Sequence, residues 1–220
     1  MISLNSTIKQ IVLICKPFTY LLVSKCIVMQ EMNNTNQQIL SYGRTFLQCR
    51  GYNGFSYRDI SQKLGIRNAA IHHYYPLKED LVATIFESIR QQFTKDIDKM
   101  AQSGCSAIEE LQYFFDFMLR EFDEGRNICP IGSLILDFEE LPEKVKEQHL
   151  LLMENVLAWF SEVLKNGLQK GEFIFSEPVD MRAEAIVETL LGARQLASIK
   201  GRKTLERSIL IIKSDLGWKN

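Results

Sequence analysis

The stretch from Gly51 to Pro76 carries helix start and stop signals so closely spaced that only short helices fit between them. Ser56 and Asp59 form an S-x-x-D capping box, in which the two side chains satisfy free N–H groups of a new helix turn. Gly65 supplies the permissive backbone of a tight turn, and Pro76 stops the helix that follows it. The segment therefore predicts two short helices joined by a tight turn, which is the helix-turn-helix arrangement.

Apolar residues at three-to-four-residue spacing predict longer helices on both sides of this segment. Asn34 and Thr35 are expected to cap a first helix, which carries Ile39 and Leu47 and ends near Arg50. The 12 glycines and 5 prolines among 220 residues are few, which favours helices over a turn-rich β fold. We expect an all-α fold, with further helices at Leu77 to Ser103, after Gly104, at Ile131 to Phe138, from Pro142 to near Gly171, at Val179 to Lys200 and at Lys203 to Ser214.

The first residues of the chain are apolar enough to raise the question of a membrane anchor. The run from Ile8 to Met29 is split by Lys16-Pro17 and by Lys25 into pieces shorter than the roughly twenty residues that a spanning helix needs. It also lacks the small-residue cleavage pattern of a signal peptide. Our preferred interpretation is that residues 1–32 are an extension ahead of a working start at Met29 or Met32. A helix packed on the body and a membrane tether are the alternatives.

Charge is distributed unevenly along the chain, although the net charge of the whole is only -1. Residues 33–80 hold six basic and three acidic side chains, a net charge of +3. Residues 81–220 hold 17 basic and 23 acidic side chains, a net charge of -6. A basic N-terminal segment on an acidic body is typical of a protein with one end that faces phosphates.

Several function classes lack their signatures in this sequence. It has no G-x-S-x-G, no phosphate-binding loop, no H-E-x-x-H and no convincing cysteine–histidine pairing, so we do not expect an enzyme. The five cysteines are odd in number and scattered, with no C-x-x-C pair, which argues against a disulfide framework or a zinc site. We expect a protein of the reducing cytoplasm without a metal or other cofactor.

The segment from Ile39 to Leu81, with its core GYNGFSYRDISQKLGIRNAAIHHYYPLKEDL, resembles the DNA-binding domain of the TetR/AcrR repressor family. Gly51 matches the family's turn glycine, Gly65 its helix-turn-helix glycine and Lys78 the lysine that starts its fourth helix. The family's recognition helix usually ends in tyrosine-histidine-histidine-phenylalanine, which corresponds to the segment 72–75 here. Three positions depart from the family pattern: Ala69, where glycine is frequent, His72, where tyrosine is common, and Leu77, where a serine would cap the next helix.

A short helix that stands clear of the body can enter the major groove of DNA and offer its first side chains to base edges. On this basis the predicted base contacts are Arg67, Asn68, Ala69, Ala70 and His72. Side chains around that helix are better placed to hold phosphates, which fixes register without reading sequence. The predicted phosphate contacts are Ser56, Tyr57, Arg58, His73, Tyr74 and Lys78. A structural role for His72 remains an open alternative.

The resemblance also implies a homodimeric repressor that a small ligand releases from a pseudo-palindromic operator. It divides the chain into the extension 1–32, a helix-turn-helix DNA-binding domain at 33–80, and a helical-bundle domain at 81–220 for ligand binding and dimerisation. Two alternatives stay open. One is a constitutive DNA-organising protein on the same fold, and the other is a repressor that senses electrophiles or oxidants through Cys129.

Residues for the ligand and for the dimer follow from the same resemblance. The aromatic-rich helix after Ser106 is expected to line a pocket, although core packing also explains such a stripe. The expected pocket residues are Tyr113, Phe114, Phe117, Met118, Arg120 and His149. Small and apolar residues on the penultimate helix would let two copies approach closely in a four-helix bundle. The expected interface residues are Leu190, Gly192, Ala193 and Ala197.

Overall fold

The computed structural model describes residues 18–126 and 128–218, with side chains from Asn34 onward, and over these residues the chain is helical without strands. The α-helices are α2 (Phe18–Arg50), α3 (Tyr57–Leu64), α4 (Asn68–Tyr74), α5 (Lys78–Ser103), α6 (Ala107–Asp123), α7 (Glu143–Gln169), α8 (Val179–Lys200) and α9 (Lys203–Asp215). Two 3₁₀ turns, η1 (Gly132–Leu134) and η2 (Phe138–Glu140), join α6 to α7. The prediction of an all-α fold is confirmed.

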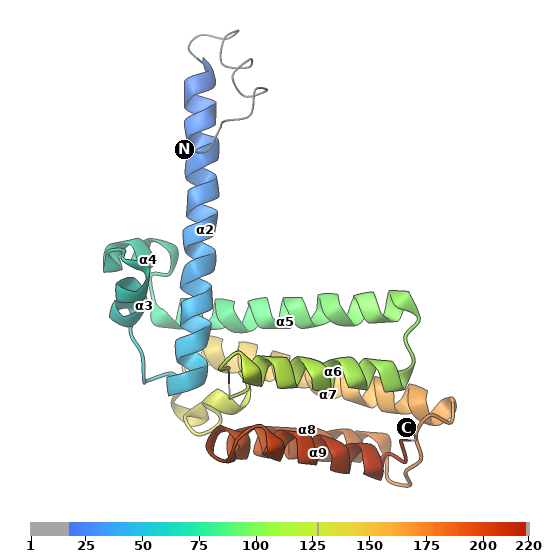
Figure 1. The fold of residues 1–220 in the computed structure, drawn as a ribbon. Coiled ribbons are helices and arrows are strands. Elements are labelled where there is room, and N and C mark those ends of the chain that lie inside the picture. Colours follow the sequence, from blue (N-terminus) through green and yellow to red (C-terminus); the bar gives the residue numbers. More distant parts are fainter. Residues whose placement is uncertain (1–17, 127, 219–220) are drawn as a thin grey trace.

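Helices α3 and α4 form a small head beside α2, at one end of the long helix α5 (Figure 1). The capping box at Ser56 is present, because Asp59 accepts hydrogen bonds from the Ser56 backbone N–H at 2.8 Å and from its hydroxyl at 2.6 Å. Gly65 ends α3 with a φ of 66°, a left-handed conformation that a side chain would strain. The local signals therefore produce the two short helices and the turn as predicted.

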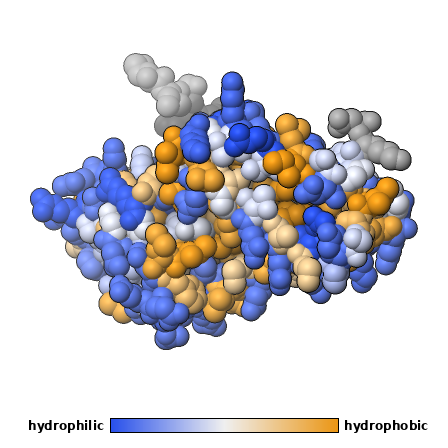
Figure 2. All heavy atoms as spheres, turned by 90° about the horizontal axis from the view of Figure 1, so that it is seen from below, coloured by the Kyte–Doolittle hydropathy of each residue, from blue (hydrophilic) through white to orange (hydrophobic). Residues whose placement is uncertain are grey.

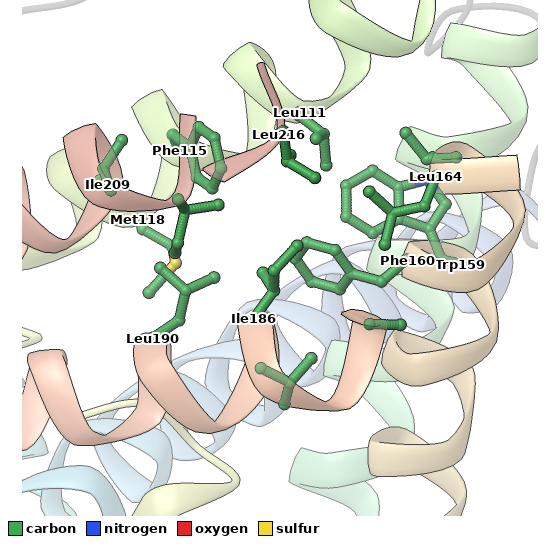
Figure 3. Packing of buried hydrophobic residues seen from close by; sticks show 14 of the residues in the cluster. Leu111, Phe115, Met118, Trp159, Phe160, Leu164, Ile186, Leu190, Ile209 and Leu216 are labelled. Atoms are coloured by element: carbon green, nitrogen blue, oxygen red, sulfur yellow. The ribbon is translucent and has the colours of Figure 1, made fainter. Parts of the chain in front are cut away.

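Helices α5 to α9 stack as a bundle, with α8 and α9 side by side at the far end from α4 (Figure 1). The core of this body is an apolar cluster from α6, α7, α8 and α9. Figure 3 shows Trp159 and Phe160 of α7 among Leu111 and Phe115 of α6 and Ile186 of α8. Burial of these large side chains against one another is the main force that holds the helices together.

A second apolar cluster joins the head to the body. It contains Ile60 and Ile71 of the head, Leu81 at the start of α5 and Val145 of α7, all fully buried. The boundary near residue 80 therefore falls inside a continuous core rather than in a linker. Because interiors are close-packed, a displacement in the body is transmitted to the head.

Several predicted boundaries are wrong. The first helix does not begin at a cap formed by Asn34 and Thr35, because α2 starts at Phe18 and no glycine or proline interrupts it before Gly43. The segment Ile131 to Phe138 forms 3₁₀ turns instead of a short α-helix. Pro142 occupies the N-cap of α7, one position before the first helical residue. The other helices lie within about two residues of their predicted bounds, the usual uncertainty of helix ends.

Part of the expected extension at residues 1–32 lies outside the described residues, and so does the start of the Ile8–Met29 run. Within the described part of the chain, none of the helices combines the length and the apolar character needed to cross a membrane.

Candidate nucleic-acid interface and internal cavity

The start of α4 lies at the surface of the head. Arg67 is its N-cap, and Arg67, Asn68 and Ala69 are exposed, while Ala70 is half-buried. Ile71, on the opposite side of the same helix, is fully buried in the cluster shared with the body. The helix therefore presents four of the five predicted base-contact residues away from the core and is held in place by its inner face.

Tyr57 does not present its hydroxyl to solvent. The residue is buried, and the hydroxyl donates to the backbone carbonyls of Tyr75 at 2.9 Å and Leu77 at 2.7 Å. Burial raises the pKa of this phenol, with the neighbouring Asp80 acting in the same direction. The prediction of a phosphate contact by Tyr57 is wrong, because its polar atom ties α3 to the turn between α4 and α5.

The ammonium group of Lys78 also forms hydrogen bonds within the head. Its ammonium donates to the carbonyls of Tyr52 and Phe55, at 2.5 Å each, and lies over both aromatic rings. Burial lowers the pKa of Lys78, and the charge of Asp59 partly offsets that shift. Since an ammonium has three donors, one remains for a phosphate. The main role of Lys78 in this structure is to close the loop between α2 and α3.

The remaining predicted DNA contacts differ in their exposure and in their contacts within the head. Arg58 and His73 are exposed, whereas Tyr74 is half-buried with its ring against that of His73, 5.6 Å between centroids. Ser56 is exposed, but its hydroxyl hydrogen is directed to Asp59. The ring of His72 packs edge-on against Tyr57, at 4.8 Å between centroids. Arg58 and His73 are thus open to a phosphate, while His72 is exposed as well as packed on Tyr57, so both roles considered for it stay open.

An internal cavity of about 170 Å³ lies between α5, α6, α7 and α8. Four of the six predicted pocket residues line it: Tyr113, Phe114, Phe117 and Met118. Sequence reasoning missed other aromatic walls, among them Phe93 of α5 and Trp159 of α7, whose rings are 5.7 Å apart. Aliphatic side chains outnumber the aromatic rings in the lining, so the cavity is mainly apolar.

Two predicted pocket residues lie elsewhere. His149 is buried under η1, with Nε2 2.8 Å from the carbonyl of Ile131, and burial lowers the pKa of its ring. Arg120 is exposed on α6, 5.8 Å from the centre of the Tyr113 ring. Neither of the two residues lines the cavity.

One end of the cavity is charged, and the sequence did not reveal it. Arg44 of α2, Glu121 of α6 and Arg194 of α8 all line the cavity. Glu121 Oε2 accepts from Arg44 at 2.9 Å and from Arg126 Nε at 2.8 Å, and its Oε1 accepts from Arg126 Nη2 at 2.5 Å. Arg194, only 3% exposed, donates to the Arg126 carbonyl at 2.5 Å.

Ionisation in this charged end follows from burial and charge. Burial by itself raises the pKa of Glu121, but the hydrogen bonds from Arg126 and the charges of Arg44, Arg126 and Arg194 outweigh it and hold that pKa below its usual value. Burial lowers the pKa of Arg44 and of Arg194. The cluster thus holds one ionised carboxylate among three guanidinium groups.

Cys129 also lines the cavity, close to Arg194. Its sulfur accepts a hydrogen bond from the Gly132 N–H at 3.2 Å. Burial raises the pKa of the thiol, an effect that this hydrogen bond and the charge of Arg194 only partly offset. A thiol whose pKa is raised is a poor nucleophile at neutral pH, which disfavours the electrophile-sensing alternative.

Helices α8 and α9 cover the face seen in Figure 2, which shows apolar patches among charged side chains. Leu190, Ala193 and Ala197 are at most 5% exposed and belong to the protomer's own core, so their prediction as interface residues is wrong. Gly192 is exposed, as an interface would require. The large apolar side chains that α8 and α9 do expose are Met181, Leu196, Ile199, Leu210 and Ile211.

Comparison with known sequences points to the same family as the helix-turn-helix of the head. Residues 39–85 match the profile of bacterial regulatory proteins of the tetR family. The chain is 26% identical over 157 residues to the Transposon Tn10 TetC protein of Escherichia coli. This match covers 63% of this chain and 77% of that protein. It is 18% identical over 178 residues to the HTH-type transcriptional repressor DhaR of Mycobacterium sp. (strain GP1), covering 80% of this chain and 89% of that protein.

Comparison with solved structures extends the similarity to the body. A TetR-family transcriptional regulator from Agrobacterium tumefaciens superposes with a TM-score of 0.79 at 27% identity, over 84% of this chain and 98% of that one. A match over 84% of the chain extends well beyond residues 39–85. Residues 39–85 are thus a DNA-binding domain of the tetR family, and the chain has the fold of TetR-family transcriptional regulators.

Proposed function

We propose that this protein is a homodimeric repressor that binds a pseudo-palindromic operator through α4 and leaves it when a small molecule fills the cavity. The observation that carries the proposal is the position of Arg44, which stands on the helix that leads into the head and also lines the cavity. A repressor of this kind has to couple two sites, and a cavity-lining residue on the helix that packs against α3 provides a physical link.

The proposed DNA contacts follow from exposure and chemistry. Arg67 and Asn68 have the side chains that form bidentate hydrogen bonds to guanine and adenine, and Ala69 and Ala70 are small enough to let the helix approach thymine methyl groups. Arg58 and His73 flank that helix on the exposed side and supply the phosphate contacts. The name of the relative DhaR as a transcriptional repressor supports repression over activation.

The proposed dimer uses the outward face of α8 and α9. Leu196, Ile199, Leu210 and Ile211 are each at least half exposed, an apolar surface that a monomer in water gains nothing by displaying. A Cβ built on Gly192 meets no described atom within 4 Å, which leaves room for the close approach of a second helix. Two copies joined here carry two heads, as a two-fold symmetric operator requires.

Ligand release is supported by two tight links between α2 and the body near the cavity. One is the ion pair of Arg44 with Glu121, and the other is a 2.7 Å hydrogen bond from the side-chain amide of Gln48 to the Ile128 carbonyl. A ligand that changes these contacts shifts α2 and with it the spacing of the two heads. The cavity favours this mechanism over a constitutive DNA-organising protein, which needs no internal site.

The test is selection of bound sequences from a random duplex pool by the purified protein, in moderate salt with random competitor. The proposal predicts enrichment of a sequence with two inverted half-sites. The matched control is Arg67→Ala, whose selected sequences should lose preference at one position in each half-site. Failure of the wild-type protein to enrich any sequence would contradict the proposal.

A further inference from the structure

We propose that the outward face of α8 and α9 accepts a second copy of this chain in one alignment, with the two α8 helices antiparallel and opposite charges of the two copies paired across the contact. The inference deepens the dimer of the proposed function, because it gives the register of that dimer, and it rests on it. It follows from the positions of four exposed charged side chains, from their lack of partners within one copy and from two-fold symmetry.

The outward face of α8 is a stripe that follows the helical period. Its exposed members lie three or four residues apart and are Glu184, Glu188, Gly192, Leu196 and Ile199. Lys200 is turned about 100° away from Ile199 and lies outside the stripe. Helix α9 follows α8 after a connection of two residues and packs along it, so it runs back beside α8 (Figure 1). The first turn of α9 therefore lies beside the last turn of α8.

The two ends of this face carry opposite charge. Glu184 and Glu188 lie about one turn apart in the first half of α8, and both are exposed. Lys203 and Arg207 lie about one turn apart in the first half of α9, beside the last part of α8, and both are exposed as well. The face is thus acidic toward one end and basic toward the other, and the two residues of each pair are separated by a rise of about 6 Å.

The four charges have no partner within one copy. Among the residues that the structure describes, none of these four side chains takes part in a hydrogen bond or an ion pair. Charged residues at the flanks of the face are paired, since Arg182 lies 2.6 Å from Glu177 and Arg202 lies 3.0 Å from Asp123. The four unpaired charges are therefore available to a second copy.

Two-fold symmetry converts this pattern into ion pairs. The crossing point of two antiparallel α8 helices is set at Gly192, where an added Cβ would meet no atom within 4 Å. A residue before Gly192 then faces the partner's surface at the same distance after it. Glu188 lies four residues before Gly192 and faces the partner's Arg207, which is four residues back from the end of the α8–α9 pair. By the same count Glu184 faces the partner's Lys203, and symmetry forms each pair twice.

The same charges oppose a parallel alignment. With the two α8 helices parallel, Glu188 would lie against the partner's Glu188 and Arg207 against the partner's Arg207. Like charges held together at an interface cost several times what an exposed ion pair gains. The pattern therefore selects the antiparallel register and disfavours contact with chains that lack it. A single register also fixes the distance between the two heads.

Exchange of the charges between two variants tests the register in the full-length protein. The first variant carries Glu184→Lys with Glu188→Lys, and the second carries Lys203→Glu with Arg207→Glu. Each alone should raise the dimer dissociation constant at least about tenfold in analytical ultracentrifugation, because like charges then meet at every pair. An equimolar mixture should form heterodimers about as tight as the wild-type dimer, because every pair is again of opposite charge.

The matched control reverses two exposed glutamates elsewhere. Glu147→Lys with Glu154→Lys makes the same change of charge on α7 and should leave the dissociation constant unchanged. Circular dichroism checks that each variant is folded. If a double variant does not fold, Glu188→Lys and Arg207→Glu repeat the exchange with one substitution in each chain. A mixture that associates no more tightly than its components, or variants that dimerise like the wild type, overturns the register.

Failure of this inference is distinguishable from failure of the proposed function. A wild-type protein that stays monomeric while it binds DNA would contradict the proposed dimer itself. A wild-type dimer without rescue in the mixture would overturn the charge-paired register and leave the dimer and its DNA binding standing.

Discussion

The Nη2 atom of Arg44 lies 2.9 Å from Oε2 of Glu121 and so joins the helix that enters the head to the helix that lines the cavity. The two residues are 77 positions apart in the sequence. Glu121 is only 7% exposed and the Arg44 side chain is 31% exposed, so the ion pair is partly shielded from the solvent screening that weakens surface pairs.

The acid stability of the protein should depend on Glu121. The pKa of this carboxyl is held below its ordinary value of about 4.3 in the folded state and is ordinary in the unfolded chain. At a pH between the lowered pKa of the folded state and the ordinary pKa of the unfolded chain, the unfolded state binds more protons. The stability that ionised Glu121 contributes is therefore complete above the ordinary pKa and is lost as the pH falls through the lowered pKa.

Substitution measures this effect. Glu121→Gln should cost about 1–3 kcal/mol at neutral pH because charge-assisted hydrogen bonds from two arginines are weakened. The difference from wild type should shrink as the pH falls below about 4.3, in urea unfolding followed by circular dichroism. Glu124→Gln, at an exposed partner of Arg126, is the control. A difference that stays constant with pH would rule out Glu121 as the titrating group.

Tyr57→Phe should destabilise the head. The substitution removes the hydroxyl that donates to the carbonyls of Tyr75 and Leu77 and leaves those acceptors without it. The expected loss is about 1–3 kcal/mol in the free energy of unfolding. Tyr42→Phe, at a residue 37% exposed, should change it by less than about 0.5 kcal/mol. Equal stability of wild type and Tyr57→Phe, with weaker DNA binding, would instead restore the phosphate-contact role.

Arg67 and Arg58 should differ in what they contribute to DNA binding. Arg67→Ala is expected to cost about 1–3 kcal/mol on the selected sequence and little on random DNA, because it removes a base contact. Arg58→Ala should weaken both DNAs similarly and reduce the slope of affinity against salt by about one. Fluorescence anisotropy over a range of salt concentrations measures both effects. Identical behaviour of the two variants would contradict the assignment.

Much of the head was predictable because its signals are local. The capping box at Ser56, the turn at Gly65 and the stop at Pro76 each act within a few residues, and the structure contains all three. The aromatic cavity walls on α6 were predictable for the same reason, since Tyr113 to Met118 lie on consecutive turns. Local patterns failed at the start of α2, where nothing in the sequence signals that the helix continues through Asn34.

The charged end of the cavity was not predictable, because Arg44, Glu121 and Arg194 come from three distant helices. One signal was present in the sequence. Glu121 follows Met118 by three residues and so lies on the apolar stripe of α6, where a charged residue requires a partner. The prediction of interface residues on α8 failed for another reason. That helix is apolar on two faces, so periodicity does not tell the inner face from the outer one.

The outward face of α8 and α9 should control dimerisation. Ile199→Glu places a charge on a side chain that is 84% exposed, so the fold of the protomer should tolerate it. Sedimentation should then show monomers at concentrations where the wild type is dimeric. Lys200→Glu, the neighbouring position, is the control for charge alone. A dimer that survives Ile199→Glu would place the interface elsewhere.

Two heads held at a fixed distance should bind one symmetric DNA site, so the affinity should depend on the spacing of the half-sites. Inserting about five base pairs, half a helical turn, between the selected half-sites places them on opposite faces of the duplex. The insertion should lower the affinity at least tenfold and reduce binding to that of a single half-site. Unchanged affinity after the insertion would contradict it, because each head would then bind on its own.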